Sequence, residues 1–315
     1  MQITQSTNKL INYKIIIGLL VCWFVGLFIF PAPAEAQEMS LSITPPLTEI
    51  AIQPGKVFTQ TFTVSNDGTP VVIKPEIVPF VPSDSNGHAE IIEDQTSINA
   101  FSSWFLFDQT PYSLGENSNH DFTVKITPPE GTPEKDYYFT FLVETQNDNN
   151  LGVNNAQAKE RIGANILMNI TKDGNPNKKA SIIKFSAPRI LDSFTGLTYT
   201  IQLGNSGSSF FKPSGKITVD QILGSTTILN LAPLNILVNG TREISCLESQ
   251  DLVPCKLPGK FLIGIYRSNL SFTVDGAGST VEKQIYTVAF PFTIALGLIM
   301  IGISYGFIRK LAKYK

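Results

Sequence analysis

Cys246 and Cys255 lie nine positions apart in the segment CLESQDLVPC, a spacing that suggests a covalent or metal-binding role. In an oxidising compartment two nearby thiols form a disulfide more often than they stay free. Zinc is the alternative, but a four-ligand zinc site would need further ligands from elsewhere in the chain. The only histidines are His88 and His120, and neither neighbours a cysteine in the sequence. We therefore predict a disulfide between Cys246 and Cys255 and no metal site.

Acidic residues in the segments DSNGHAE and AEIIED are the remaining candidates for chemistry. Glu90, Glu93 and Asp94 could supply the pair of carboxylates that glycoside hydrolysis uses, although their segment is also typical of a solvated strand edge and loop. The segment that begins at Asp84 places oxygen donors around a glycine, but it does not follow the spacing of an EF-hand calcium loop. Sequence motifs of serine hydrolases, zinc proteases and nucleotide-binding loops are absent. We predict no catalytic residues and no cofactor, with an extracellular hydrolase as one alternative.

The charge balance limits the class of partner. The chain carries 24 Lys and Arg against 26 Asp and Glu, which gives a formal net charge of -2. Proteins that bind nucleic acid cluster Lys and Arg on one surface, because these side chains displace the counterions of the phosphates. No long basic run is present, so we expect no nucleic-acid partner.

Residues 1–36 have the form of a secretory signal peptide. An apolar run from Ile15 to Phe30 follows two lysines, and PAPAEAQ then places Ala34 and Ala36 at the small-residue positions of a cleavage site. An uncleaved amino-terminal anchor is the alternative, because the apolar run is long for a signal and short for a membrane span. In both cases the residues that follow are expected outside the cytoplasm.

Residues 286–308 are predicted to form a single transmembrane helix. The segment has no charged side chain, and at ~1.5 Å per residue it is about long enough to cross a ~30 Å hydrocarbon layer. The tail at 309–315 is basic, so the positive-inside rule places the C-terminus in the cytoplasm and residues 37–285 outside the cell membrane. The lipid bilayer is therefore an expected partner of this single-pass protein.

Alternating apolar and polar residues between the two ends predict β-strands. Turn signals such as SNDGTP, PPEGTP and GNSG separate the runs. The clearest runs are Phe58, Phe62 and Val64; Phe122, Val124 and Ile126; Tyr137, Phe139, Phe141 and Val143; and Leu197, Tyr199, Ile201 and Leu203. Short strands with regularly spaced turns are typical of a β-sandwich.

The pattern of strands and turns occurs twice, on either side of the polar segment TKDGNPNKKA. We therefore predict an all-β fold of two tandem immunoglobulin-like β-sandwich domains, residues 37–172 and 180–285, with a linker at 173–179 and the C-terminal transmembrane helix. Residues 146–160 are too polar to bury and are expected to form a long exposed loop. Trp104 is expected in the first core, with stacking on a ligand as the alternative.

Several segments, taken in order, resemble a known family. They are the signal peptide, SLSITPPLTEIAIQPGKVFTQTFTVSNDG, SSWFLF, ITPPEGTPEKDYYFTFLVET, LGNSGSSFFKPSGKITV, LNILVNGTREI, and the membrane helix with its basic tail. Over nearly the whole chain this order is similar to that of the WxL-interacting proteins of Gram-positive bacteria. The resemblance implies that the first sandwich binds peptidoglycan, that the second binds partner proteins or host ligands, and that the helix anchors both at the membrane.

Two features depart from that family. The segment WFL at 104–106 spells W-x-L, but it lies in the first sandwich and has no second copy, so it does not constitute the wall-binding domain of the family's partner. No LPxTG-like motif precedes the tail, so the helix is expected to stay in the membrane. The resemblance assigns no individual binding residues.

Together these features predict a membrane-anchored extracellular binding or adhesion protein, not an enzyme, that recognises cell-wall peptidoglycan or another surface protein. The main alternative is an architectural subunit or stalk of a cell-envelope complex. Such a complex could assemble through Gly302 and Gly306, whose small-xxx-small spacing suits the pairing of membrane helices.

Overall fold

The computed structural model describes residues 41–146, 160–222, 224–259, 261–275 and 277–313. The predicted signal peptide at 1–36 lies outside the described residues, as do residues 147–159 of the predicted long loop. The strands on either side of that loop pair with each other in antiparallel orientation.

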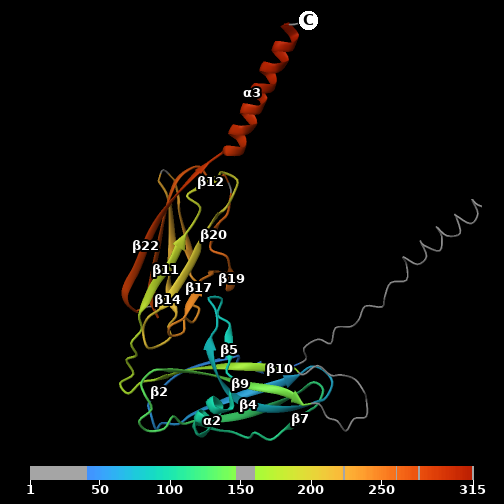
Figure 1. Cartoon of the computed structure of the whole chain (residues 1–315), viewed down its shortest axis with the longest axis vertical. Helices are drawn as coiled ribbons and strands as arrows, with labels where there is room; N and C mark the ends of the chain where they lie inside the picture. Colours follow the sequence, from blue (N-terminus) through green and yellow to red (C-terminus); the bar gives the residue numbers. More distant parts are fainter. Residues whose placement is uncertain (1–40, 147–159, 223, 260, 276, 314–315) are drawn as a thin grey trace, which may run out of the picture. The chain divides into compact units, whose positions relative to one another are not determined.

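The first sandwich comprises two sheets and a short helical segment (Figure 1). One sheet has the order β1-β3-β8-β6, and the other has the order β2-β10-β9-β4-β5 with β7 paired to β4. The elements are β1 (Leu41–Thr44), β2 (Leu47–Ile52), β3 (Phe58–Asn66), β4 (Val71–Pro82), β5 (Ala89–Ile91), α2 (Gln95–Phe101), η1 (Ser102–Trp104), β6 (Phe105–Leu106), β7 (Tyr112–Leu114), β8 (Ser118–Ile126), β9 (Asp136–Gln146) and β10 (Arg161–Ile170).

Apolar alternation along the strands forms the first core, as predicted. Phe122, Val124 and Ile126 on β8 are buried, and so are Phe139 and Phe141 on β9. Although β8 and β9 are consecutive, they belong to different sheets, so the intervening PPEGTP segment crosses from one layer to the other. The rings of both sheets therefore meet in the middle of the sandwich.

The second sandwich is built in the same way from two main sheets, β11-β14-β17 and β12-β22-β21-β15-β16, and two short strand pairs, β13-β20 and β18-β19. Its strands are β11 (Ala180–Ser186), β12 (Ile190–Asp192), β13 (Leu197–Thr198), β14 (Thr200–Asn205), β15 (Pro213–Gln221), β16 (Thr226–Asn230), β17 (Thr241–Glu243), β18 (Cys246–Glu248), β19 (Asp251–Val253), β20 (Lys256–Leu257), β21 (Gly264–Val274) and β22 (Ala277–Phe290). The predicted linker at 173–179 lies between β10 and β11.

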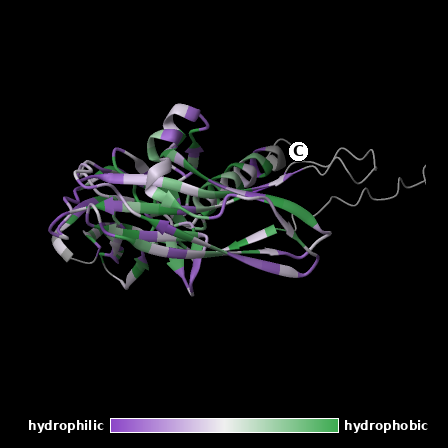
Figure 2. Cartoon of the chain, turned by 90° about the horizontal axis from the view of Figure 1, so that it is seen from below, coloured by the Kyte–Doolittle hydropathy of each residue, from purple (hydrophilic) through white to green (hydrophobic). Residues whose placement is uncertain are grey.

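A second, separate core fills this sandwich. Leu197, Tyr199, Ile201 and Leu203 are all buried, and the Tyr199 hydroxyl bonds to the Ser268 hydroxyl at 2.8 Å. Hydrophobic and hydrophilic segments alternate along many strands in Figure 2, which is the pattern expected of strands with one face in a core. The predicted all-β fold of two tandem immunoglobulin-like sandwiches followed by a C-terminal apolar helix is confirmed.

The C-terminal helix begins later than the sequence analysis predicted. Residues 286–290 belong to strand β22, and helix α3 runs over Phe292–Lys313. Hydropathy alone cannot separate the two elements, because the end of β22 is as apolar as the helix. Thr287 and Ala289 point into the second core and pair with β21, while Pro291 separates the strand from the helix. Within α3, the 19 residues of Phe292–Lys310 are long and apolar enough to cross a membrane.

Cys246 and Cys255 are joined by a disulfide in the second sandwich. Both residues are buried, and the β18-β19 hairpin lies between them. The bond closes a short loop at the rim of the core.

Replacing both cysteines with serine is expected to lower the free energy of unfolding of the second sandwich by about 2 to 3 kcal/mol, because the unfolded chain regains the entropy of an open loop. Differential scanning calorimetry with and without a reducing agent measures this change. The serine variant should show no further response to the reductant. An unchanged melting temperature in both experiments would show that the loop adds nothing to stability.

Candidate functional site between the two sandwiches

The turn between β4 and β5 reaches toward the second sandwich and is shaped by Asp84. One carboxylate oxygen of Asp84 accepts hydrogen bonds from the backbone N–H groups of Asn86, Gly87 and His88 at 2.9 to 3.1 Å. The other oxygen lies 2.6 Å from Nδ1 of His88. These bonds, above all the one from the His88 side chain, lower the pKa of Asp84 to about 2. The segment considered above for calcium, which does not follow the EF-hand spacing, is thus a hydrogen-bonded turn.

Contacts from this turn tie it to strand β17. The backbone N–H of Glu243 donates to the carbonyl oxygen of Ser85 at 2.7 Å. Gly87 has a φ of 91°, and a Cβ atom there would come within 2.5 Å of Cζ of Arg242. The backbone conformation therefore favours glycine at this position, and a side chain there would also displace the guanidinium group.

A second set of contacts centres on Asp136, at the start of β9. The carboxylate of Asp136 accepts hydrogen bonds from the Asn169 amide and the Tyr138 hydroxyl, both at 2.7 Å, and from the backbone N–H of Phe210 in the second sandwich. The Tyr138 hydroxyl in turn accepts from the backbone N–H of Val238 at 3.0 Å. Burial raises the pKa of Asp136 in spite of these donors, and it also raises the pKa of Tyr138.

A third set of contacts involves Glu49 on β2. Its carboxylate pairs with the Lys212 ammonium group at 2.8 Å and accepts a hydrogen bond from the Asn235 side-chain amide. Both partners belong to the second sandwich. The two sandwiches are therefore joined by hydrogen bonds at three places.

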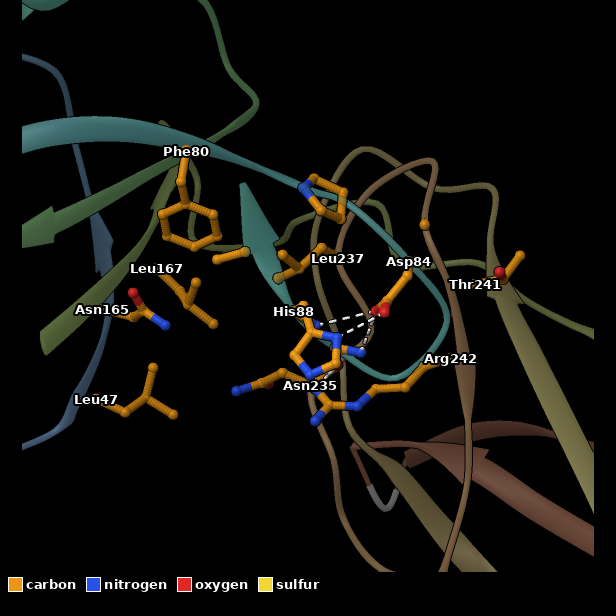
Figure 3. Close-up of a pocket in the computed structure, with 14 residues that line it drawn as sticks. Leu47, Phe80, Asp84, His88, Asn165, Leu167, Asn235, Leu237, Thr241 and Arg242 are labelled. Carbon is orange, nitrogen blue, oxygen red and sulfur yellow. Dashed lines mark hydrogen bonds and ion pairs between the residues drawn. The ribbon is translucent and has the colours of Figure 1, made fainter. Parts of the chain in front are cut away.

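A cavity of about 210 Å³ lies among these contacts (Figure 3). Phe80, Leu167 and Leu47 form an apolar side, and His88, Asn235 and Arg242 lie across from them in Figure 3. The full lining is Leu47, Phe80, Pro82, Asp84, Gly87, His88, Ala89, Asn165, Leu167, Asn235, Leu237, Gly240, Thr241 and Arg242. Both sandwiches contribute, so the cavity exists only while they stay together.

Two polar atoms in this lining are buried without a hydrogen-bond partner. They are Nε of Arg242, a donor, and Oδ1 of Asn235, an acceptor. A further N–H group of Arg242 donates to the Asn235 carbonyl oxygen at 2.7 Å and fixes the guanidinium in place. Burial lowers the pKa of Arg242, and the nearby carboxylate of Asp84 opposes that effect. An arginine nevertheless stays protonated at neutral pH, so the lining residues include a positively charged guanidinium group and the neutral amide of Asn235.

A larger hollow, of about 780 Å³, lies in the second sandwich between β16 and the disulfide hairpin. None of the described polar atoms that are buried without a partner belongs to its lining. An unpaired buried donor or acceptor costs free energy that a ligand can recover. We therefore take the smaller cavity, at the junction, as the candidate functional site.

No known protein family matches the sequence, and no curated protein matches it. Solved structures with a partly similar fold include the class 5 fimbriae chaperone CfaA, at 10% identity over 80% of this chain and 99% of that chain, with a TM-score of 0.40. The E. coli chaperone DraB is 14% identical over 78% and 98% of the two chains, with a TM-score of 0.37. A protein of unknown function from Porphyromonas gingivalis W83 is 9% identical over 79% and 99%, with a TM-score of 0.30. At these scores we infer neither family nor function, and the resemblance to WxL-interacting proteins stays a prediction.

Two of the three acidic residues considered for hydrolysis have structural partners. Glu93 pairs with Arg161 at 2.6 Å, and Asp94 caps helix α2 by accepting from the backbone N–H of Ser97 at 2.9 Å. Glu90 is exposed on β5. Among the residues that the structure describes, no cluster of three or more His, Cys, Asp or Glu side chains is placed to hold a metal ion.

The other singled-out residues lie apart from the cavity. Trp104 is buried in η1 against Phe101 and Tyr137, with ring centroids 5.1 and 4.9 Å away, so it belongs to the first core. Gly302 and Gly306 have no atom within 4 Å of the position of an added Cβ, so helix pairing stays a prediction.

The sequence did not mark the residues that form the cavity as one site, although the segments DSNGHAE and LNILVNGTREI, considered above, contain several of them. Asn235 lies among apolar residues and Arg242 in a polar stretch of the second sandwich, and Glu49 and Asp84, which interact with them, are far away in the chain. Only the fold brings them together.

Proposed function

We propose that this protein is a membrane-anchored binding protein whose two sandwiches together hold a ligand from the cell wall or from another surface protein. The observation that carries the proposal is the cavity at their junction, which is lined by residues of both sandwiches, including Arg242 and Asn235. A ligand with a carboxylate or amide group could pair with the guanidinium and amide side chains that line the cavity, and peptidoglycan and protein chains each offer such groups.

Anchorage in the cell membrane is supported by helix α3. Its Phe292–Lys310 segment has the length and composition of a membrane span, and Arg309 and Lys310 stand at its far end. By the positive-inside rule the C-terminus is cytoplasmic and both sandwiches lie outside. A single span of this kind attaches the second sandwich directly to the outer surface of the bilayer, because β22 leads into α3.

Action by binding, without catalysis, is the simplest account of the polar side chains at the junction. The carboxylates of Asp84, Glu49 and Asp136 each serve to hold the two sandwiches or their turns in place. A junction tied in this way is preorganised, which reduces the entropy lost when a ligand binds.

Replacing Arg242 with glutamine is expected to weaken ligand retention at least about tenfold, because one charge-assisted hydrogen bond is worth about 1.5 to 3 kcal/mol. The full-length protein, in detergent or nanodiscs, is incubated with purified cell wall and separately with solubilised surface proteins of the same organism. The matched control is Arg267→Gln. Arg267 on β21 pairs with Asp220 on β15 at 3.0 Å, and it is not part of the cavity lining.

The two inputs distinguish the two classes of ligand. Retention by the wall that is lost in Arg242→Gln and kept in Arg267→Gln would support recognition of peptidoglycan. Capture of a defined surface protein with the same dependence would support a protein ligand. Equal binding by both variants would overturn the role of the cavity, and no binding to either input would favour the architectural alternative.

A further inference from the structure

Strand β22 leads into α3 at one end of the second sandwich (Figure 1). Large apolar side chains are exposed in this part of the sandwich. Six of them are exposed by 41 to 63% and lie on three neighbouring strands and two adjacent loops. We call this set the collar, and it consists of Ile190, Phe194, Phe261, Ile265, Val288 and Phe290. Contiguous exposed apolar residues on a soluble domain usually mark a surface that is covered in the native state.

Three of the four strand members of the collar form one row across the sheet. Val288 on β22 is paired in register with Ile190 on β12 and with Ile265 on β21. All three side chains point away from the core, because the neighbouring Thr287 and Ala289 on β22 are buried. The row is thus a flat apolar strip on the outer face of the sheet.

The same face becomes polar with distance from α3. The next pair along β21 and β22 is Arg267 with Tyr286, and the pair after it is Asn269 with Gln284. The following pair, Ser271 with Glu282, is joined by a side-chain hydrogen bond of 3.1 Å. Along this face the side chains change from aliphatic, through a tyrosine and an arginine, to amide and carboxylate groups. This order of side chains matches the change in polarity across a membrane interface, where tyrosine is enriched.

The loop members of the collar are two phenylalanines that contact each other. The rings of Phe194 and Phe261 meet edge to face with centroids 5.4 Å apart, and both remain exposed. The backbone at Phe261 has a φ of 89°, which is strained for a large side chain. This conformation is maintained although the ring gains little burial from it in the protein alone.

Hydrogen bonds fix the collar to the start of α3. The carboxylate of Asp192 accepts from the backbone N–H of Thr293 at 2.9 Å and from that of Phe194 at 3.0 Å. The backbone N–H of Ser193 donates to the carbonyl oxygen of Phe290 at 3.2 Å. The collar therefore cannot move far from the residue at which the helix begins.

The length of α3 places the collar at the level of the lipid headgroups. The 19-residue segment spans about 28 Å, and it ends in Arg309 and Lys310, whose charges must reach the far headgroups. The apolar part is consequently shorter than a ~30 Å hydrocarbon layer, which draws the start of the helix inward. At about 3.3 Å per strand residue, Phe290 and Val288 follow within roughly 7 and 13 Å of Phe292.

From these observations we infer that the collar inserts into the outer interface of the bilayer that α3 crosses, so that the second sandwich rests on lipid. This inference depends on the membrane anchorage proposed above. The occupant is the boundary between headgroups and acyl chains, where aromatic and aliphatic side chains on a peripheral surface are buried. A second copy of the chain on this face is the competing outcome that the experiment distinguishes.

Tryptophan quenching in proteoliposomes tests the collar in the full-length protein. The vesicles contain phosphatidylcholine and phosphatidylglycerol whose acyl chains are brominated near the headgroup end, and bromine quenches only tryptophans within contact range. Phe194→Trp and Phe290→Trp probe the collar. Val57→Trp, at a position that is 62% exposed in the first sandwich, is the solvent control, and Phe307→Trp, on α3, is the control for the span. Each signal is taken as the difference from the unmodified protein.

The expected result is that the added fluorescence at positions 194 and 290 is reduced at least about twofold in brominated vesicles, with no reduction at position 57. Quenching at position 307 without quenching at positions 194 and 290 would overturn the inference that the collar inserts into lipid. It would remain consistent with α3 crossing the membrane. Absence of quenching at position 307 would overturn the proposed membrane anchorage by α3. The inference about the collar depends on that anchorage and would fall as well. A further outcome is that the fluorescence of the tryptophans at positions 194 and 290 is unaffected by bromine while its emission wavelength changes with the protein-to-lipid ratio. That result would show that a second copy of the chain, and not lipid, covers the collar. Thermal melting of each variant shows whether the sandwiches remain folded.

Discussion

Replacing Phe141 with alanine is expected to lower the free energy of unfolding of the first sandwich by about 3 to 5 kcal/mol, the range for removing a fully buried phenylalanine. Phe141 is completely buried, and its ring stacks on Phe62 with centroids 4.7 Å apart and planes inclined by 6°. Phe122 and Phe107 close the remaining sides at 5.7 and 6.1 Å. Because these rings come from both sheets, neighbouring side chains cannot collapse into the space without moving a strand.

Chemical denaturation of the full-length protein, followed by the fluorescence of Trp104, measures this change. Trp104 is part of the same core and therefore reports on the first sandwich. Val57→Ala serves as the control, because Val57 is exposed and its removal should change stability by no more than about 0.5 kcal/mol. A loss below about 1 kcal/mol for Phe141→Ala would show that β9 does not supply the centre of this core.

Replacing Asp136 with alanine is expected to lower the free energy of unfolding by about 2 to 4 kcal/mol. The substitution leaves three hydrogen-bond donors without an acceptor in a partly buried position. The donors are the side chains of Tyr138 and Asn169 and the backbone N–H of Phe210. The last of these belongs to the second sandwich, so the contact between the sandwiches should loosen as well. Faster tryptic cleavage within the linker at 173–179, together with a lower melting temperature, would report both effects.

Asp121→Ala is the matched control, because Asp121 makes one exposed hydrogen bond, to Thr63, within the first sandwich. It should leave both the melting temperature and the rate of linker cleavage nearly unchanged. Equal behaviour of the two variants would mean that Asp136 does not hold the sandwiches together.

The raised pKa of Asp136 adds a dependence on pH to the same prediction. A carboxyl whose pKa is higher in the folded protein than in the unfolded chain favours folding while it is protonated. That contribution is complete below the unfolded pKa and is lost as the pH rises through the folded pKa. The stability of the natural protein relative to Asp136→Asn should therefore fall over this range as the pH increases. If the stability of the natural protein relative to Asp136→Asn instead rises with pH, burial is not the dominant influence on the pKa of Asp136.

Much of the fold could be predicted from local pattern. The alternation at Phe122, Val124 and Ile126 correctly identified a strand with one buried face, because a period of two has a direct structural meaning. The placement of β8 and β9 in opposite sheets could not be predicted in this way, since a turn segment does not specify which layer the next strand joins. The start of α3 was misplaced for a related reason: the outward residues of β22 near its end are themselves apolar.

The candidate site could not be predicted at all from spacing in the sequence. Arg242 stands in the polar segment NGTREIS, which has the composition of an ordinary surface loop. Its significance comes from the approach of Gly87 and from the burial of its Nε, and both depend on contacts between distant parts of the chain. Motif searches find chemistry that is local in sequence, whereas this cavity is assembled from β2, β4, β10 and the residues around β17.

The direct passage of β22 into α3 has a mechanical consequence. Tension between the sandwiches and the helix would act along β22, which is paired on one side with β21 and on the other with the parallel strand β12. The hydrogen bonds of these ladders run across the strands, so a lengthwise pull loads many of them in shear at once. A strand held on both sides in this way resists extraction better than a hairpin that opens one bond at a time. The attachment of the second sandwich to its helix is therefore suited to carrying a sustained load.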